Sequence, residues 1–427
     1  MSPVAQRRAT LLRAFDAAVA AAHPRVCLGP HLPPPPAGGR LVVLAAGKAG
    51  ASMAAVAEAF YRESHGFAAE GLAVTRHGYG EPAGAIEVVE AGHPVPDEAG
   101  IAATVRSLAM AQAAGEGDLV LVLLSGGGSA NWIAPAGDLT LTDKQGITRA
   151  LLRSGANIGE INTVRKHLSR IKGGRLAQAA APARVLTLAI SDVPHDDPAV
   201  IASGPTVPDP STLADAWAVA ARRGVDLPAS ARALLDDAAQ ETPKPGDPVF
   251  ARSEFRIIAR PADAIAAAAE VVAAQGYEPV VLGADLEGEA RDVAMEHARQ
   301  ALALARDGRR AALISGGELT VTIAGRGRGG PNQEYALALA VALAGAPGIA
   351  ALAADTDGTD GGAGSASDPA GAMVDETTLA RAQSLGLDAG ARLADNDSTA
   401  FFEPLRDLVA TGPTRTNVND CRIILIG

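Results

Sequence analysis

Short, continuous runs of apolar residues recur along this chain, and each ends abruptly in a glycine-rich loop. The clearest of them lead into GKAG, SGGGSAN, SDVPHDD, SGGELT and DTDGTDGG. A short apolar run bounded by glycine predicts a strand that is buried on both faces. Between these runs, apolar residues return at helical spacing. The alternation therefore predicts an α/β protein with a doubly wound, mostly parallel sheet.

The pattern predicts strands and helices along the whole chain. Strands are expected at 41–46, 71–75, 86–90, 119–124, 184–190, 254–259, 278–282, 311–315, 319–323, 349–353 and 421–426. Helices are expected after the GKAG turn and at 5–22, 98–114, 142–155, 160–181, 211–240, 261–275, 288–305, 332–345 and 376–385. Gly173 and Gly174 are placed to stop or kink the helix at 160–181. The strand at 319–323 is expected to belong to a hairpin.

Two proline-rich segments interrupt the pattern. HLPPPPAGG (31–39) predicts a stiff linker after the first helix, and ETPKPGDP (241–248) is the clearest domain boundary. We therefore expect an N-terminal helix and linker over 1–36, a three-layer α/β domain over 37–240 and a smaller α/β domain over 249–427. Because open α/β sheets bind ligands beyond the carboxyl ends of their strands, we expect the site in a cleft between the domains.

Composition narrows the class of protein. The net charge is −11 over 427 residues with no long basic tract, which argues against nucleic acid as a partner. The first residues lack the apolar stretch of a signal peptide, and no run of about 18 apolar residues predicts a membrane span. Cys27 and Cys421 lack the spacing of a zinc site. We expect a soluble, cytoplasmic protein with reduced thiols.

The loop SGGGSAN is the strongest chemical signal. Gly126, Gly127 and Gly128 expose backbone N–H groups, and Ser125 and Ser129 add hydroxyl donors. This combination suits a phosphate or carboxylate group. The alternative is a tight turn that needs positive φ angles, although three glycines between two serines exceed what a turn requires.

A basic segment, VRKHLSRIKGGR at 164–175, stands out in the acidic chain. Arg165 and Lys166 are candidates for a positive lip over a substrate. The alternative is a solvated helix face, and the sequence leaves both open.

Lys48 stands between two glycines at the end of the first strand. The motif is neither a P-loop, which needs GxxxxGK[ST], nor the dinucleotide fingerprint GxGxxG, and no acidic residue ends the next strand. Lys48 suits a cation that contacts a transferring phosphoryl group. The alternative is an exposed lysine in a turn.

Carboxylates cluster in two other loops, SDVPHDD and DTDGTDGG. Hard cations such as Mg²⁺ take one or two carboxylates plus ligand phosphates. Asp192 is the best-placed candidate, and Asp355 and Asp357 are the candidates in the second loop. Caps and close-packed turns are the alternative for these residues.

The segment 315–334 combines Glu318, Arg326, Arg328 and Asn332 near a predicted helix start. Two arginines among glycines favour contact with an anion, whereas a solvated hairpin would place them in water. Asn332 could also cap the helix. All four residues are candidates for binding substrate or phosphate.

Taken together, these motifs resemble glycerate 2-kinases of the two-domain MOFRL type. The resemblance runs from GKAGASM through SGGGSA, INTVRKHLSRIKGGRLA, SDVPHDDPAVIASGPT and GGPNQEYALALA to DTDGTDGG. It implies a Rossmann-like domain, a smaller MOFRL domain and an active site in the cleft between them. It also implies phosphorylation of D-glycerate at its 2-hydroxyl by ATP and Mg²⁺, giving 2-phosphoglycerate.

The resemblance carries over to single residues only in part. The active-site lysine proposed for the family matches Lys48. An arginine proposed before the NQE segment is replaced here by Pro331, so Arg326 or Arg328 would have to substitute. His195 stands where glycine is expected in the SDVP loop.

Our hypothesis from the sequence is therefore phosphoryl transfer, with Lys48 and Arg328 offsetting charge on the γ-phosphoryl group. Asp192 would hold Mg²⁺ or accept the hydroxyl proton, and the loops of the two domains would face each other. One alternative is an NAD(P)H-dependent hydroxypyruvate reductase, which the missing fingerprint opposes. Another is a non-catalytic sensor of sugar acids or nucleotides. A homodimer is left open.

Overall fold

The computed structural model describes residues 2–361 and 365–427. The chain forms two compact units: Cys27–Ile258 is one, and the chain up to Val26 together with Ala259–Gly427 is the other. This division differs from the expected one. The first helix belongs with the C-terminal part, and the proline-rich segment 241–248 lies inside a unit. We describe each unit by itself.

The unit Cys27–Ile258 contains a six-stranded sheet in the order β3-β2-β1-β4-β5-β6. The pairs β1–β2, β1–β4, β2–β3 and β4–β5 are parallel. This is the strand order of the Rossmann fold. The strands are β1 Leu41–Ala46, β2 Ala69–Arg76, β3 Glu87–Ala91, β4 Leu119–Leu124, β5 Arg184–Ile190 and β6 Ser253–Ala259.

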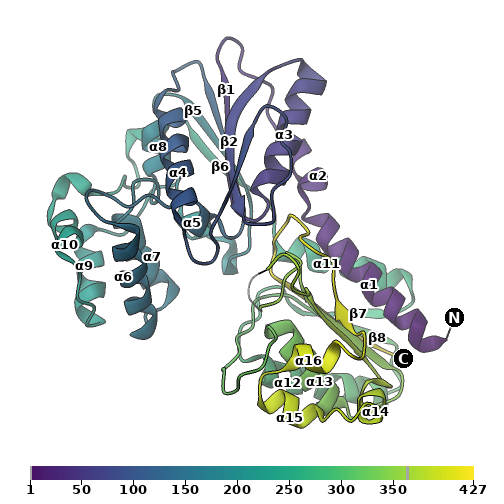
Figure 1. Ribbon diagram of the computed structural model, residues 1–427. Helices are drawn as coiled ribbons and strands as arrows, with labels where there is room; N and C mark the ends of the chain where they lie inside the picture. The colour runs from purple at the N-terminus through teal and green to yellow at the C-terminus, as the bar shows by residue number, and fades with distance from the viewer. Residues whose placement is uncertain (1, 362–364) are drawn as a thin grey trace. The chain divides into compact units, whose positions relative to one another are not determined.

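β1, β4 and β5 match the predicted ranges because their residues are almost all buried, which is what a continuous apolar run signals. The strand predicted at 254–259 exists, but it joins this first sheet and does not begin the second one. Figure 1 shows α3 on one face of the sheet and α4 and α8 on the other. The helices around the sheet are α3 Gly50–His65, α4 Glu98–Gln112, α5 Gly128–Asn131 and α8 Arg175–Ala180.

Four further helices of this unit form a group beside the sheet with a core of their own (Figure 1). They are α6 Leu141–Arg153, α7 Ile158–His167, α9 Leu213–Arg222 and α10 Ala229–Asp236. The helix predicted over 160–181 is broken into α7 and α8. Gly173 and Gly174 lie in the break with φ angles of 59° and 82°, which glycine adopts without strain.

The other unit contains a six-stranded sheet in the order β11-β10-β9-β12-β8-β7. Only β7 and β8 pair in parallel; the four other pairs are antiparallel. The strands are β7 Glu278–Gly283, β8 Ala311–Ser315, β9 Ile349–Asp355, β10 Gly371–Asp375, β11 Leu408–Val409 and β12 Asp420–Ile426.

One predicted strand is absent from this sheet. The range 319–323 is not a strand; within it only Thr320 forms an isolated bridge, with Glu289. Ile323 is 80 % exposed, so the alternating pattern there has no neighbouring strand to pair with. β10 and β11 were not predicted from the sequence.

Helices cover both faces of the second sheet, with α1 and α11 on one side and α12 and α13 on the other (Figure 1). The long helices are α1 Pro3–Ala21, α11 Pro261–Ala274, α12 Ala290–Arg306 and α13 Pro331–Leu343. Shorter ones are α2 Pro24–Cys27, α14 Thr378–Ser384, α15 Ala389–Ala394 and α16 Ser398–Phe402. α1 packs on α11, which explains why the N-terminal helix belongs to this unit.

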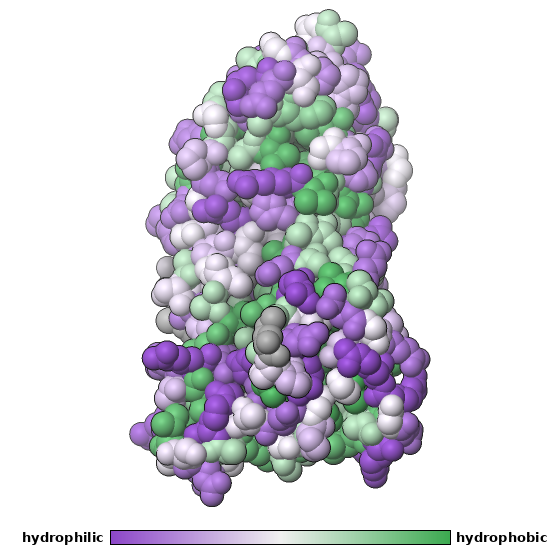
Figure 2. Space-filling view, turned by 90° about the vertical axis from the view of Figure 1, so that its right-hand side faces the viewer, coloured by the Kyte–Doolittle hydropathy of each residue, from purple (hydrophilic) through white to green (hydrophobic). Residues whose placement is uncertain are grey.

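Hydrophilic residues are scattered among hydrophobic ones over the face that Figure 2 draws. Within the described part of the chain, no helix is both long and apolar enough to span a membrane.

Candidate functional site

The turn between β1 and α3 carries Lys48 and is tied to the loop after β4. Gly47 has a φ of 117°, and a side chain there would overlap Ser125, so glycine is required for the two loops to touch. The backbone N–H of Lys48 donates to Gly126 O at 2.8 Å, and that of Ala49 donates to Ser125 Oγ at 2.9 Å. The structure thus brings the half-buried Lys48 and the glycine loop together.

The loop Ser125–Ser129 is held tightly at the end of β4. Ser125 is fully buried, so its hydroxyl fixes the backbone and does not face solvent. Gly127 has a φ of 84°, and a side chain there would come within 2.9 Å of the His93 ring. Ser129, on α5, is half-buried. Of the two serines, Ser129 is therefore the one that can present its hydroxyl to a ligand.

Lys172 lies beneath Ser129, although the sequence did not single it out. Its Nζ is 2.6 Å from Ser129 O and 2.6 Å from Ser129 Oγ. Ser203 Oγ lies 2.8 Å from Ser129 Oγ on another side. Lys172 and Ser203 are only 2 % and 1 % exposed. Three side chains from three segments therefore meet, and Ser129 alone reaches toward the surface.

Strained backbone brings Ser203 to this position. Ala202 and Ser203 have φ angles of 50° and 61°, in the left-handed region that favours glycine. The loop is anchored because Gly173 N donates to Ser203 O at 3.1 Å and Gly174 N to Gly204 O at 2.8 Å. Strain of this kind costs about 1–3 kcal/mol per residue and clusters at functional sites.

Buried cations surround Lys172. Lys144, on α6, donates to Leu168 O at 2.9 Å. Burial, with the charges of Arg165 and Arg175, lowers the pKa of Lys144 to about 7. Burial, with the charges of Lys144 and Arg165, lowers the pKa of Lys172 well below its usual range. Within residues 2–361 and 365–427, neither amine has a carboxylate partner.

Arg165 and Lys166 are neighbours on α7 with different surroundings. Burial lowers the pKa of Arg165, and its guanidinium has no ion pair within the described chain. Lys166 is 7 % exposed and pairs with Asp209 at 3.4 Å, which also accepts from Thr242 Oγ1 at 3.1 Å. Arg165 is therefore available for an anionic ligand, whereas Lys166 belongs to an interior network.

Asp192 follows β5 and is half-buried. Because β4 and β5 are neighbouring parallel strands, Asp192 and the loop after β4 lie at the same edge of the sheet. The loop continues through a 3₁₀ turn, Pro194–Asp196, in which His195 has a φ of 62°. This is a conformation in which glycine would be unstrained.

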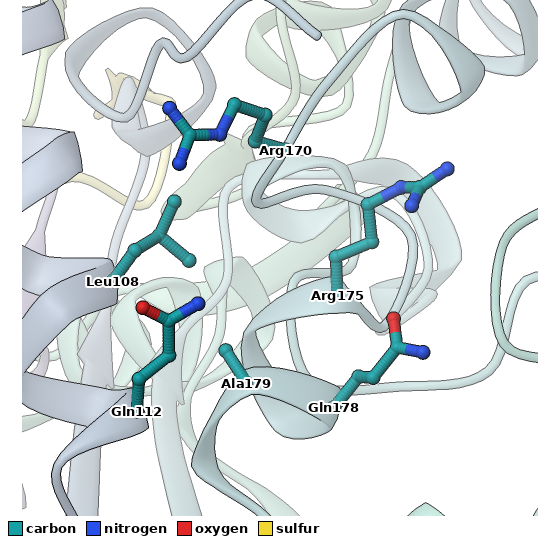
Figure 3. Close-up of a pocket in the computed structure, with 6 residues that line it drawn as sticks. All are labelled: Leu108, Gln112, Arg170, Arg175, Gln178 and Ala179. Carbon is teal, nitrogen blue, oxygen red and sulfur yellow. The ribbon is translucent and has the colours of Figure 1, made fainter. Parts of the chain in front are cut away.

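A pocket of about 330 Å³ lies between α4 and α8, away from the glycine loops. Figure 3 shows Leu108 and Gln112 on one side of it and Arg175 and Gln178 on the other, with Arg170 beside Leu108. Ala179 completes the wall. None of the site residues predicted from the sequence lines this pocket.

The loop after β9 gathers carboxylates. Asp357 N donates to Asp355 Oδ1 at 2.8 Å, and Thr359 N donates to Asp357 Oδ1 at 2.7 Å. Asp357 is 1 % exposed, so both carboxylates hold their own loop. Gly362, which ends the DTDGTDGG motif, lies outside the described residues. No group of three or more His, Cys, Asp or Glu side chains suited to a metal ion occurs in the rest of the chain.

Asp360 caps the start of α13. Its Oδ1 accepts from Asn332 N at 2.9 Å, and its Oδ2 accepts from Gln333 N at 2.8 Å. The alternative that Asn332 caps this helix is therefore wrong: Gly330 occupies the cap position. The Asn332 side chain is 1 % exposed and donates to Asp420 Oδ1 at 2.6 Å.

Arg422 completes this buried acidic network. Its Nη1 pairs with Asp420 Oδ2 at 2.8 Å, and its Nη2 donates to Gly317 O at 3.1 Å. Burial raises the pKa of Asp360 to about 7. Burial also raises the pKa of Asp420, although the charge of Arg422 opposes the shift. In this network the charge of Asp420 is paired with Arg422, whereas Asn332 Oδ1 is buried without a hydrogen-bond partner in the described chain.

Glu318, Arg326 and Arg328 are exposed. Their segment is held by its backbone, since Arg326 N donates to Asp395 Oδ1 at 3.0 Å and Arg328 N donates to Asp397 Oδ1 at 3.1 Å. The Arg328 guanidinium lies 4.0 Å from Glu403, a distance that leaves it able to reach a ligand.

Sequence reasoning missed Lys172, Ser203, Asp420 and Arg422, and it included Asp360 only as one of the aspartates of the loop 355–360. The available signal for Lys172 was its place before the glycine pair 173–174. The signal for Ser203 was its place in the SGPT segment, and the signal for Asp360 was its place as the last aspartate of DTDGTD. Each acquires its role through a contact that is distant in sequence.

Two family models match the chain. One is described as a domain of unknown function (DUF4147) and matches residues 10–236; the other is described as the MOFRL family and matches residues 311–420. A protein of Agrobacterium vitis, provisionally named hydroxypyruvate reductase, is 51 % identical over 98 % of this chain and 94 % of its own length.

Kinases are also among the similar proteins. A D-glycerate 2-kinase of Thermotoga maritima is 41 % identical over 91 % of each chain. The crystal structure of a glycerate kinase from Thermotoga maritima has a TM-score of 0.87 to this chain at 38 % identity. That comparison covers 99 % of this chain and 100 % of the other.

Proposed function

Because the chain belongs to the family that joins a DUF4147 domain to a MOFRL domain, we propose that it is an ATP-dependent glycerate 2-kinase. It transfers the γ-phosphoryl group of ATP to the 2-hydroxyl of D-glycerate and forms 2-phosphoglycerate. The observation that carries this proposal is the strand-end edge of the first sheet. There the glycine loop after β4 contacts Lys48 and Lys172. Arg165 has no carboxylate partner in the described chain and lies close enough to Lys172 to affect its pKa.

Phosphoryl transfer depends mainly on positioning and on neutralising charge, which suits this edge. The backbone N–H groups of Gly126 and Gly127 hold one anionic group, either a nucleotide phosphate or the glycerate carboxylate. Gly128 supports them, because its N–H donates to Ser125 O at 3.2 Å. Lys48 offsets the charge that develops on the γ-phosphoryl group. Arg165 adds a guanidinium for the same anionic ligands, and Ser129 contacts glycerate through its hydroxyl.

Asp192 is the residue that we propose to hold Mg²⁺. A single carboxylate at a strand end fits this ion, because Mg²⁺ takes one or two carboxylates and fills its other positions with phosphate oxygens and water. When bound, Mg²⁺ would neutralise charge on the nucleotide phosphates. Asp355 and Asp357 fit less well, because both accept hydrogen bonds from their own loop.

Residues of the other unit have proposed roles as well. Arg328, or Arg326 in its place, contacts a phosphate through an exposed guanidinium. Glu318 is proposed to contact the substrate. The buried Asn332 positions the loop after β9 through Asp360 and Asp420. That the two sets of loops face each other stays a prediction.

Reduction of hydroxypyruvate is the second candidate, favoured by the Rossmann strand order and by the name of the Agrobacterium vitis relative. The turn after β1 reads GKAGAS where a dinucleotide enzyme needs GxGxxG. β2 ends in Arg76, which lies over the Tyr79 ring at 5.1 Å and is 5 % exposed. The kinase is therefore the better-supported function.

Two assays with the purified full chain test the proposal. ADP formation should depend on D-glycerate, ATP and Mg²⁺ together, and should stop when any of them is omitted. Hydroxypyruvate with NADH or NADPH should give no loss of absorbance at 340 nm. Robust oxidation of either nucleotide without glycerate-dependent ADP formation would overturn the kinase assignment.

The proposal also covers the location of the enzyme in the cell, its partners and its oligomeric state. We propose a cytoplasmic enzyme whose partners are D-glycerate and a nucleotide, and a homodimer stays open. Size-exclusion chromatography with light scattering measures the assembly directly.

A further inference from the structure

Ser129, Lys172 and Ser203 form a chain of hydrogen-bonding groups that anion binding does not require. Lys172 Nζ lies 2.6 Å from Ser129 Oγ, and Ser203 Oγ lies 2.8 Å from the same atom. An ammonium meant to hold an anion would face the ligand. Lys172 is 2 % exposed and faces Ser129 from below, so a ligand meets it only through the Ser129 hydroxyl.

The surroundings of Lys172 favour a neutral amine. The charged groups that face it are Lys144 from α6 and Arg165 from α7. The helix α5 contributes the carbonyl and hydroxyl oxygens of Ser129, and the loop 201–203 contains no charged residue. The carboxylates of this region are engaged elsewhere: Asp209 with Lys166, and Glu241 with His167 and Lys244. Like charges and burial both disfavour the ammonium form.

If the amine of Lys172 is neutral, a hydrogen-bond donor and acceptor can be assigned to each contact among Lys172, Ser129 and Ser203. An ammonium would donate to both Ser129 O and Ser129 Oγ, which lie 2.6 Å from Nζ. A neutral Lys172 can instead donate one N–H to Ser129 O and accept the Ser129 hydroxyl proton on its lone pair, with Ser203 donating to Ser129 Oγ. One lone pair of Ser129 Oγ then remains for a ligand, and Ser129 is the half-buried member of the group. A substrate hydroxyl that donates there would be aligned with the Ser129–Lys172 hydrogen bond.

We propose that Ser129, backed by Lys172, accepts the proton of the substrate 2-hydroxyl during phosphoryl transfer. The proposal rests on the kinase function proposed above. As the 2-oxygen forms its bond to the γ-phosphorus, its O–H bond breaks and the proton passes to Ser129 Oγ. The original Ser129 proton passes to Lys172 Nζ. The bond between the γ-phosphorus and the β,γ-bridging oxygen breaks, and ADP leaves; Lys172 then returns its proton to water.

In this arrangement Ser129 touches the substrate, whereas Lys172 is a positioning residue that acts through it. Ser203 fixes the Ser129 rotamer from the other side. The strained backbone at Ala202 and Ser203 fits this role, because strain of this kind clusters at functional sites and the loop places the Ser203 hydroxyl 2.8 Å from Ser129 Oγ.

The pH dependence of kcat distinguishes a role of Lys172 in proton transfer from a purely structural role of this residue. In the wild type, kcat should rise with pH along an acidic limb, because the acceptor works only in its neutral form. Lys172→Ala should lower kcat by about 10²- to 10⁴-fold, the usual range for general acid–base catalysis, and should abolish the limb. Methylamine should restore part of the activity of Lys172→Ala in proportion to its free-base concentration.

Lys144→Met is the matched control. Lys144 is also a buried lysine, but it donates to Leu168 O and does not contact Ser129. Its removal takes away one cause of the low Lys172 pKa. The limb should therefore move to higher pH, while kcat on the alkaline plateau stays within about twofold of wild type, as expected when no group in contact with the substrate is removed.

The outcomes are distinguishable. If the wild type forms ADP with D-glycerate but Lys172→Ala keeps the acidic limb, or folds normally and is not rescued by methylamine, the proton-acceptor role is wrong and the kinase stands. If the limb stays in place in Lys144→Met, Lys172 is not the titrating group and the role is likewise wrong. If the wild type forms no glycerate-dependent ADP, the kinase function and this role fail together.

Discussion

The two sheets of this protein share a theme, because both end strands in glycine-rich loops, yet their loops carry opposite charge. At the edge of the first sheet, the cation Lys48 lies against the glycine loop after β4, and Arg165 lies close enough to Lys172, which contacts Ser129, to affect its pKa. At the edge of the second sheet, Asp360 and Asp420 lie in a network with Asn332 and Arg422.

The difference lies in how each charge is satisfied. The carboxylates of the second sheet have partners inside the protein: Asp360 caps α13, and Asp420 pairs with Arg422. Arg165 has no such partner within the described chain. A buried charge without a partner is costly, so the first edge is the one that an anionic ligand stabilises. The network of Asp360 and Asp420 instead holds the loop after β9 in place.

The largest effect is expected for Lys48→Ala. The variant should keep its fold, because the substitution retains the backbone N–H of residue 48 that donates to Gly126 O. Loss of a cation that stabilises the transferring group should lower kcat about 10²-fold or more. A coupled assay for ADP measures it, and near-normal turnover would remove Lys48 from the mechanism.

Arg165→Ala and Lys166→Ala sharpen the comparison, because these neighbouring cations should respond differently. Arg165→Ala should raise KM for glycerate or ATP roughly 10- to 100-fold, the value of a charge-assisted contact of about 1.5–3 kcal/mol. Lys166→Ala should leave KM unchanged but lower the free energy of unfolding by about 1–3 kcal/mol, because it leaves Asp209 buried without its cation. Equal effects on KM would contradict the assignment.

A smaller effect on turnover is expected for Arg328→Ala. Its exposed guanidinium should contribute a phosphate contact, so we expect kcat to fall several-fold, within about 1–2 kcal/mol. Arg326→Ala is the matched variant two residues earlier. If Arg326→Ala lowers kcat and Arg328→Ala does not, Arg326 takes the proposed role. If neither variant changes kcat, neither of these two arginines takes part in the reaction.

The pH dependence of stability tests whether Asp360, in the loop after β9 of the second sheet, is protonated in the folded protein. The pKa of Asp360 is raised to about 7 in the folded state, above its value of about 3.9 in an unfolded chain. Its contribution to stability is therefore fully present below pH 4 and is lost as pH rises through 7. Urea unfolding at pH 5 and pH 8 should show the wild type losing about 1–3 kcal/mol relative to Asp360→Asn over this interval. A constant difference between the two proteins would show that Asp360 is already ionised at pH 5.

The sequence predicted the fully buried strands best. β1, β4, β5 and β8 have the expected bounds because a continuous apolar run between glycines leaves few other structures. The prolines before β6 signalled a break in the chain but not which sheet the next strand joins. The range 319–323 alternates like a strand but finds no neighbour, and β10 was missed because its short run follows a long glycine-rich loop.

The parts of the candidate site that lie in short local motifs could be predicted from the sequence. Ser125–Ser129 and Lys48 could be selected from local motifs, because glycines at strand ends have few other uses. Lys172 and Ser203 could not be selected in this way. They are 43 and 74 residues from Ser129 along the chain, and their meeting depends on the left-handed turns at Gly173–Gly174 and Ala202–Ser203.

The central claim, that this protein phosphorylates the 2-hydroxyl of D-glycerate, is tested most directly by the ³¹P NMR spectrum of the reaction product. Full conversion with ATP, Mg²⁺ and D-glycerate should give a phosphomonoester signal split into a doublet by the single proton on carbon 2. A triplet, from the two protons on carbon 3, would show transfer to the other hydroxyl, and the absence of a new phosphomonoester signal would contradict the kinase assignment altogether.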